Sequence, residues 1–362
     1  MNCYIHVPFC AAKCGYCAFY SEAGAGKELV EAYLRRLEQD LSADIVHCET
    51  VYVGGGTPTY LDCSQLERLC KLIHRYLPSD ENTELSIEAN PESLTEEKVA
   101  LLRQYFTRLS MGVQSFDAMS RERIGRRCSQ KKLLDALDLV RRAGFPHWNC
   151  DLIYSLPGQT AAMWEQDLRM AAECGVDHIS CYALTPEENS RLGATFDEDD
   201  ERETEFYQLA EHVLSGYGIH RYEISNYARR GCGCRHNLNV WRGGLLRGYG
   251  PAAAGFDGFI RRIEVESLTG WLDGDEPEVD EIPLPERLNE IFAVNLRTVD
   301  GWDEAAWQRV ENSDRWENRL KIAEKLQKSF PGQVSTSGGR IKLTPEGLLF
   351  WNTIAQEIIY GD

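Results

Sequence analysis

Short apolar segments alternate with longer amphipathic segments over about the first 225 residues of the chain. The apolar segments are as long as single strands, and they predict six strands, at Cys3–Val7, Thr50–Val53, Glu84–Ala89, Arg108–Gly112, Trp148–Ile153 and His178–Tyr182. The amphipathic segments that follow them predict six helices, at about Glu28–Ser42, Ser64–Tyr76, Glu96–Tyr105, Gln130–Ala143, Ala161–Glu173 and Glu201–Tyr217. Alternation of this kind is typical of a parallel sheet with right-handed crossovers.

Six strand–helix units are too few to close a full barrel of eight. We therefore expect an α/β fold: a partial (β/α)6 barrel, open on one side, followed by a smaller and mostly helical domain. In such barrels the functional side chains gather at the carboxyl ends of the strands. The motifs described below lie at predicted strand ends.

The pattern changes after Ile224, and the change divides the chain into three predicted parts. Residues 1–225 form the barrel, residues 226–285 a functional loop region and linker, and residues 286–362 the C-terminal domain. The stretch 225–262 is rich in glycine, arginine and asparagine and has no long periodic segment. Acidic and proline-rich stretches follow it, so we expect irregular structure throughout the middle part.

The C-terminal part has helical patterns with one short extended piece between the last two: Glu286–Asn295, Trp316–Ser329 and Pro345–Ile359, with Arg340–Leu343 extended. Thr344 followed by Pro345 is a strong helix start, because threonine caps the helix and proline suits its first position. Helices with a small β wing indicate a winged-helix-like domain. A lid on the open side of the barrel is an equally good interpretation.

Composition excludes several classes of protein. The chain has 362 residues, 43% of them hydrophobic, and a net charge of −18, which argues against nonspecific nucleic-acid binding. No run of about eighteen apolar residues predicts a transmembrane helix, and the N-terminus leaves no room for a signal peptide. Thirteen cysteines, an odd number, favour reduced thiols over a disulfide framework, so we expect a cytoplasmic protein.

Three of these cysteines form a compact motif near the N-terminus. Cys10, Cys14 and Cys17 have the spacing C-x3-C-x2-C, with no fourth cysteine beside them. Three thiolates hold three irons of a [4Fe-4S] cube and leave the fourth iron without a protein ligand. An open coordination position is typical of a reactive metal site rather than a closed structural one.

A glycine run, Gly54–Thr59, follows the second predicted strand. Glycines at a strand end let the backbone approach a ligand closely, because no Cβ intervenes. An ordinary tight turn would have the same composition. The glycine run lies one strand–helix unit after the cysteine motif, and this position favours a binding role.

Six motifs in order resemble the oxygen-independent coproporphyrinogen III oxidase-like family of radical SAM proteins. They are Tyr4–Cys10, Gly54–Thr59, Ser86–Pro91, Arg108–Phe116, Asp151–Thr160 and Cys234–Trp241. The resemblance covers essentially the whole chain. It implies a [4Fe-4S] cluster held by the three cysteines and a bound S-adenosyl-L-methionine (SAM), and we assign no residue a catalytic role.

The same resemblance implies which side chains surround SAM. Tyr4 would border its methionine moiety and Tyr16 would pack beside the cluster, while Gly55, Gly56 and Thr57 would contact SAM.

Polar residues at the next strand ends complete the implied site. The resemblance implies that Glu88 offers a carboxylate for a ligand amine or ribose and that Gln114 and Asp151 would face the barrel mouth. A lone buried charge at Asp151 is costly, so it needs a partner, either a ligand or Arg126. Arg126 matches the ligand-facing arginine of the family, although its neighbouring arginines would equally suit a solvated helix face.

Within the family the chain is more similar to the heme-chaperone branch than to the dehydrogenases. Phe19 stands where a dehydrogenase has a further cysteine, and only nine residues precede Cys10, so the extension that helps a dehydrogenase to enclose substrate is missing. His236 lies in a match to the heme-binding motif His-Asn-x-x-Tyr-Trp, with Val240 in place of tyrosine. A neutral imidazole is a suitable axial ligand of heme iron, with Cys232 and Cys234 as weaker candidates.

Three functions stay open at this point. A heme chaperone would bind heme or another tetrapyrrole, pass it to an acceptor hemoprotein and take electrons from a donor such as a flavodoxin or ferredoxin. A coproporphyrinogen III dehydrogenase would act on a tetrapyrrole side chain through a 5′-deoxyadenosyl radical. A tetrapyrrole-modifying methyltransferase is a more distant alternative.

Overall fold

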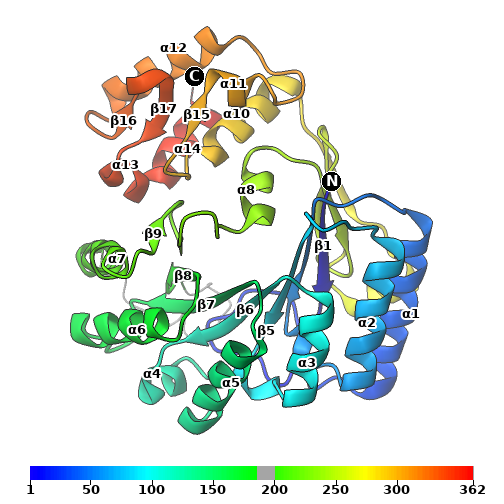
Figure 1. Cartoon of the computed structure of the whole chain (residues 1–362). Coiled ribbons are helices and arrows are strands. Elements are labelled where there is room, and N and C mark those ends of the chain that lie inside the picture. The colour runs from blue at the N-terminus through cyan, green and yellow to red at the C-terminus, as the bar shows by residue number, and fades with distance from the viewer. Residues whose placement is uncertain (186–199, 362) are drawn as a thin grey trace.

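The computed structural model describes residues 1–185 and 200–361 and contains the predicted barrel (Figure 1). Its parallel strands are β1 (Asn2–Val7), β4 (Thr50–Gly55), β5 (Glu84–Ala89), β6 (Arg108–Gln114), β7 (His147–Tyr154) and β8 (His178–Ala183). The helices between and after them are α1 (Lys27–Ala43), α2 (Cys63–Tyr76), α3 (Glu96–Tyr105), α4 (Ala118–Arg123), α5 (Gln130–Ala143), α6 (Ala161–Glu173) and α7 (Asp200–Ser215). The predicted α/β fold, its six strands and its six helices are therefore confirmed.

The helices begin where the sequence supplies capping side chains. Asp62 accepts a hydrogen bond from the Gln65 backbone at the start of α2, and Thr95 and Ser129 do the same at α3 and α5. Each cap satisfies a backbone N–H that would otherwise have no partner in the first turn. The apolar faces of these helices pack on the outer surface of the sheet and form the main core.

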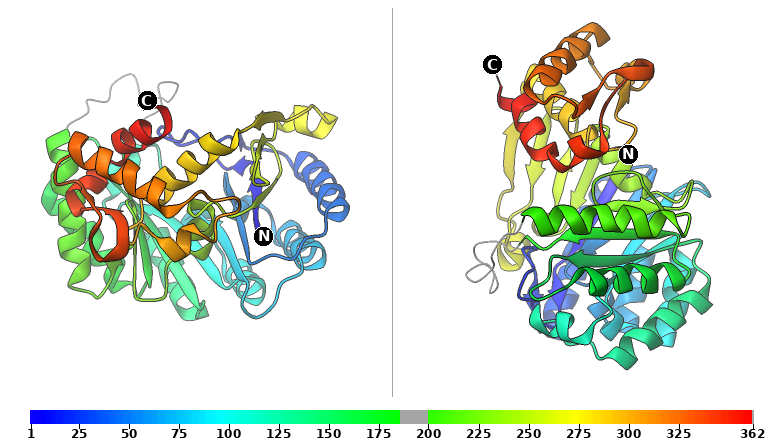
Figure 2. Two further views of the ribbon diagram at one scale, coloured as in Figure 1. Left: turned by 90° about the horizontal axis from the view of Figure 1, so that it is seen from above. Right: turned by 90° about the vertical axis from the view of Figure 1, so that its left-hand side faces the viewer.

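The sheet extends beyond the barrel strands at both edges. Its order is β14-β13-β12-β11-β1-β4-β5-β6-β7-β8-β10-β9. β9 (His220–Arg221) and β10 (Asn226–Ala228) join antiparallel at one edge, whereas β11 (Leu246–Tyr249) pairs parallel with β1 at the other. The sheet curves without closing, as the left-hand view of Figure 2 shows from above.

The middle part of the chain is more ordered than we expected. Instead of an irregular loop and linker, residues 226–285 contain β10, β11 and five further short elements. These are α8 (Arg235–Trp241), β12 (Ala254–Phe256), β13 (Ile260–Ile263), α9 (Leu268–Asp273) and β14 (Glu278–Glu281). The prediction was wrong because strands of three or four residues are too short to show periodicity, and β14 is exposed along its whole length.

The C-terminal part has its own apolar core, formed by residues 288–358. Its elements are α10 (Leu284–Asn295), β15 (Trp302–Asp303), α11 (Glu304–Trp307), α12 (Trp316–Ser329), β16 (Val334–Ser335), β17 (Arg340–Leu343), α13 (Pro345–Leu349) and α14 (Trp351–Tyr360). The single helix predicted at Pro345–Ile359 is thus divided in two, because Phe350 has non-helical backbone angles.

β15, β17 and β16 form a three-stranded antiparallel sheet beside the helices, an arrangement of the winged-helix-like kind. Figure 1 shows α8 between this unit and the barrel. The right-hand view of Figure 2 shows the C-terminal helices above the barrel. Among the described residues, no helix combines the length and the apolar character needed to cross a membrane.

Candidate cofactor site

A cavity of about 390 Å³ lies at the carboxyl ends of the barrel strands. Eleven of the thirteen predicted site residues line it: Cys10, Cys14, Tyr16, Cys17, Gly55, Gly56, Thr57, Glu88, Gln114, Arg126 and Asp151. Most come from the segment that carries the cysteines and from β4, β5, β6 and β7 or the turns directly after them, and Arg126 comes from the segment between α4 and α5, so the parallel topology brings them together. Tyr4 and His236 border a second cavity instead.

Cys10 ends the short strand β2 (Phe9–Cys10), which pairs with β3 (Glu22–Ala23), and Cys14 and Cys17 lie on the loop between these two strands. All three side chains are half-buried at the cavity wall. In a cluster, each of the three thiolates would bind a different iron.

Neighbouring groups hold two of these cysteines in place. The Cys10 Sγ lies 3.5 Å from the Thr57 hydroxyl, and a guanidinium nitrogen of Arg126 lies 3.9 Å from the Cys14 Sγ. Burial raises the pKa of the Cys14 thiol, and the adjacent Arg126 charge acts in the opposite direction. The cation therefore favours the thiolate form that a metal ligand requires.

The glycine run packs against the chain itself. A Cβ on Gly56 would lie 2.7 Å from the Phe9 carbonyl oxygen, and one on Gly55 would lie 2.7 Å from the His6 ring. Gly55 also has a φ of 107°, in the region that favours glycine. These glycines therefore bring the end of β4 against the end of β1, beside the first cysteine.

Glu88 stands at the end of β5 and faces the cavity. Its carboxylate accepts hydrogen bonds from the Tyr52 hydroxyl at 2.9 Å and from the Gly55 backbone at 3.2 Å. Desolvation by the surrounding protein and then the nearby Asp151 raise the pKa of Glu88 to about 7. The carboxyl group therefore changes its charge within the physiological pH range.

The hydrogen-bond partners of Asp151 are neutral side chains that the sequence analysis did not name. Its carboxylate accepts from the Ser110 hydroxyl at 2.9 Å and from the Asn149 amide at 2.7 Å. Desolvation raises its pKa, and these hydrogen bonds partly offset the effect. Of the two partners that the sequence left open, a ligand or Arg126, the structure does not pair Asp151 with Arg126: its hydrogen bonds come from Ser110 on the neighbouring strand β6 and from Asn149 on β7 itself.

Arg126 is directed toward the backbone and the cysteine loop. It donates to the Gly112 carbonyl at 2.5 Å and to the Asn90 side chain at 2.8 Å, and it is almost fully buried. Gln114, at the end of β6, adopts a left-handed φ of 69° and lines the same cavity. The neighbouring arginines do not form one solvated face, since Arg121 is buried and bonds the Ser115 carbonyl.

His236 is more enclosed than expected, because it lies in the first turn of α8 rather than on a loop. It is 6% exposed, and its Nδ1 is 2.8 Å from the Thr50 hydroxyl. Burial lowers its pKa to about 4, so the imidazole is neutral at physiological pH.

The second cavity, of about 490 Å³, lies between α8, β1 and the cysteine loop. Its lining is mostly apolar and includes Tyr4, His236, Val240 and Trp241. Phe19 and Asn237 line both cavities, so the two spaces are neighbours. Tyr4 therefore lines the same cavity as His236 rather than the cavity of the cysteine motif.

Two supporting residues escaped the sequence analysis. Asn90 donates to the Thr57 hydroxyl at 2.7 Å and accepts from Arg126, so it joins the glycine run to the arginine. Its place directly after Glu88-Ala89, within a recognised motif, was the available signal. Glu84 begins β5 and binds the start of α8, and no local pattern marks that contact.

Comparison with known proteins places this geometry in a family. The model of the radical SAM superfamily matches residues 4–171. The heme chaperone HemW of Bacillus subtilis is 31% identical over 98% of this chain and 97% of its own length. HemW of Escherichia coli is 34% identical over 83% of each chain.

Among solved structures, the coproporphyrinogen III oxidase HemN of Escherichia coli aligns with a TM-score of 0.84 over 99% of this chain and 90% of its own. At 21% identity this likeness shows a shared fold. The resemblance inferred from the six motifs is confirmed by the curated relatives. With one of them 31% identical over almost its whole length, the chain belongs to the HemW family of radical SAM proteins.

Proposed function

We propose that this protein is a heme chaperone, which binds heme and passes it to an acceptor hemoprotein. The observation that carries the proposal is a neutral His236 on the wall of a mostly apolar cavity, directly beside the cavity of the cysteine motif. A neutral imidazole is the form that binds iron. The names of the curated relatives support the same function.

Helix α8 supplies the proposed heme contacts from one side. Val240 follows His236 by four positions, so both side chains lie on the same face of the helix and border the same cavity. Trp241 adds an aromatic wall. Arg242 is exposed at the end of α8 and is free to approach a propionate, whereas Arg235 already donates to the Asn82 carbonyl.

The other cavity suits the cluster and SAM that are implied by the superfamily. Cys10, Cys14 and Cys17 would hold the cluster, and Glu88 would accept from the SAM amino group. Bound together, these cofactors supply one-electron chemistry. The protein around these cofactors would exclude water from them. The Tyr52 hydroxyl donates a hydrogen bond that positions the Glu88 carboxylate, and the Arg126 guanidinium lies beside the Cys14 sulfur.

An external electron donor such as a flavodoxin or ferredoxin belongs to this proposal, because the cluster needs a reductant. The cytosol is the proposed compartment. All thirteen cysteines, each within the described residues, are free thiols, which suits a reducing environment.

The proposal is tested by anaerobic heme titration of the cluster-loaded protein. We expect a Soret band in the wild type and an affinity about ten-fold or more weaker in His236→Ala. Val240→Tyr restores the aromatic face expected by the family motif and should strengthen binding. His220→Ala, which changes an exposed histidine of β9, is the matched control.

A parallel assay with coproporphyrinogen III separates the chaperone from the dehydrogenase. The chaperone gives heme binding without decarboxylation of this substrate. Decarboxylation without heme binding would overturn the proposal, and so would a heme affinity that is equal in the wild type and His236→Ala.

A further inference from the structure

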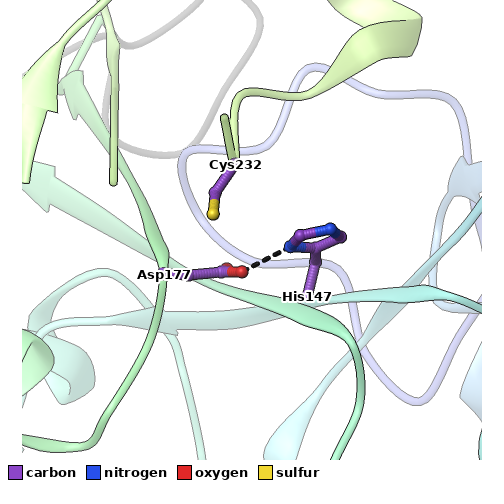
Figure 3. Close-up of side chains that lie close together, drawn as sticks. All are labelled: His147, Asp177 and Cys232. Atoms are coloured by element: carbon purple, nitrogen blue, oxygen red, sulfur yellow. Dashed lines mark hydrogen bonds and ion pairs between the residues drawn. The ribbon is translucent and has the colours of Figure 1, made fainter. Parts of the chain in front are cut away.

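A second group of ligand-type side chains lies at the opposite end of the barrel strands from the cysteine motif. His147 begins β7, Asp177 directly precedes β8, and Cys232 lies between β10 and α8 (Figure 3). One ligand atom from each residue lies within 4.8 Å of the other two. In the part of the chain that the structure describes, no other group of histidine, cysteine and carboxylate side chains converges in this way.

The backbone holds Cys232 at this position. β10 runs antiparallel to β8, so the chain that leaves β10 passes the start of β8. The Arg229 N–H donates to the Asp177 carbonyl at 2.8 Å, and the Cys232 N–H donates to the Arg229 carbonyl at 2.9 Å. On the other side, Arg108 donates to the Cys232 carbonyl at 3.1 Å. The thiol is therefore held beside the strand ends by these contacts.

The side chains already point toward one another, as Figure 3 shows. His147 Nδ1 lies 2.5 Å from Asp177 Oδ2, and the other Asp177 oxygen accepts from the Trp148 N–H at 3.2 Å. That second bond fixes the carboxylate. The His147 side chain is 37% exposed and that of Asp177 is 17% exposed, so solvent reaches one side of the group.

We propose that His147, Asp177 and Cys232 bind one divalent cation, for which Zn²⁺ is the best match, with water as the fourth ligand. Imidazole, carboxylate and thiolate are the three ligand types that Zn²⁺ takes in proteins, and a tetrahedral site needs one more. A thiolate and a carboxylate together carry two negative charges, which the ion neutralises. Hard cations such as Mg²⁺ disfavour a sulfur ligand.

Binding exchanges protons for the ion. The Cys232 thiol loses its proton to solvent. The proton on Nδ1 that faces the Asp177 carboxylate also leaves to solvent, and the neutral His147 ring carries its one proton on Nε2, so that the Nδ1 lone pair faces the metal. The ion takes the place of the direct contact between Nδ1 and the Asp177 carboxylate.

An ion here would fasten residues 229–234 to the starts of β7 and β8. This segment leads directly into α8, which carries His236 two residues after its N-cap, Cys234. The ion would thus hold in place the segment that leads to the proposed heme helix, and its site is separate from the cluster.

The test uses the full chain with its cluster loaded, so that Cys10, Cys14 and Cys17 are occupied. Zn²⁺ is titrated in competition with a chromogenic chelator. We expect one tight site per chain, weakened ten-fold or more in His147→Gln, Asp177→Asn and Cys232→Ser. Cys63→Ser is the matched control, because the Cys63 thiol also lies beside a carboxylate, that of Glu97, but belongs to no histidine-containing group.

A second measurement identifies the ligands even where a variant is poorly folded. Zinc-edge X-ray absorption of the wild type should show one sulfur at about 2.3 Å and lighter ligands at about 2.0–2.2 Å. Three sulfur ligands would instead place zinc at the cluster motif, and a shell without sulfur would exclude Cys232. Either result overturns the proposal, and so does a zinc affinity that none of the three substitutions changes.

Discussion

At the scale of single residues, the wall of the cofactor cavity contains two carboxyl groups whose pKa values are raised. Glu88 and Asp151 both have a raised pKa, Glu88 because of desolvation and then the charge of Asp151. Their hydrogen-bond partners within the described residues are neutral groups. A cavity of this kind favours a cationic ligand, and SAM carries a positive sulfonium and an amino group.

Glu88 should make SAM binding depend on pH. Its pKa is about 7, so the carboxyl group is mostly protonated at pH 6 and mostly ionised at pH 8. If the ionised form binds the SAM amino group, SAM affinity rises across this interval. In Glu88→Gln the affinity should be about ten-fold weaker at pH 8 and independent of pH, as measured by calorimetry on the cluster-loaded protein.

As the pH rises, ionisation of Glu88 should strengthen SAM binding but should lower the stability of the fold. Its folded pKa lies above the ordinary value of 4.5, so its contribution to stability is complete below pH 4.5 and is lost as the pH rises through 7. In the absence of SAM, Glu88→Gln should therefore raise the melting temperature at pH 8 relative to the wild type. A variant that binds SAM as the wild type does, with the same pH dependence, would exclude Glu88 from the SAM site.

At the scale of elements, helix α8 depends on a strand that lies far away in sequence. Its N-cap residue, Cys234, provides no side-chain cap. The Glu84 carboxylate instead accepts from the Arg235 N–H at 3.0 Å and from the His236 N–H at 2.9 Å. A negative group at a helix N-terminus also interacts favourably with the helix dipole.

Removing this cap should loosen the proposed heme site. Glu84→Ala leaves two backbone donors of α8 without their acceptor, at a cost of about 1–2 kcal/mol of folding free energy. We expect weaker heme binding with unchanged SAM affinity, and a smaller effect in Glu84→Gln, which keeps one acceptor oxygen. Glu81→Ala, an exposed neighbour, serves as the control. Equal heme affinity in Glu84→Ala and the wild type would contradict this role of Glu84.

The contrast between α8 and the barrel shows what the sequence could predict. The barrel helices are ten to seventeen residues long in most cases and strongly periodic, so their positions followed from the pattern. α8 has seven residues, and the contacts that define it reach Glu84 and Thr50, which are 151 and 186 positions from their partners. No local pattern carries that information, and for this reason the burial of His236 was not foreseen.

At the scale of the whole molecule, one arginine joins the C-terminal unit to the barrel. Arg297 follows α10 and donates to the fully buried Glu223 carboxylate at 2.8 Å. Its guanidinium also lies 4.6 Å from the ring centre of Trp241 in α8 and 5.2 Å from that of Trp351 in α14. The barrel, the proposed heme helix and the C-terminal unit therefore meet at this side chain.

Loss of the Arg297 charge should lower the free energy of unfolding, because the contact between the C-terminal unit and the barrel is weakened. Arg297→Met keeps much of the apolar stem but leaves Glu223 without its cation, and breaking such a buried pair costs about 3–5 kcal/mol. Chemical denaturation should show this loss, whereas Arg309→Met, an exposed change in the same unit, should stay within about 0.5 kcal/mol of the wild type. If the free energy of unfolding of Arg297→Met also stays within that margin of the wild type, Arg297 does not join the C-terminal unit to the barrel.

The pairing of β1 with β11 has a consequence for how the chain is made. Asn2 leaves the ribosome more than two hundred residues before its partner Leu246. Until then one edge of β1 has no neighbour, although β4 has already covered the other. Contacts of such high contact order form slowly, and an open strand edge invites pairing with other chains. A nascent chain stalled before residue 246 would therefore present this edge to its neighbours and to chaperones throughout the pause.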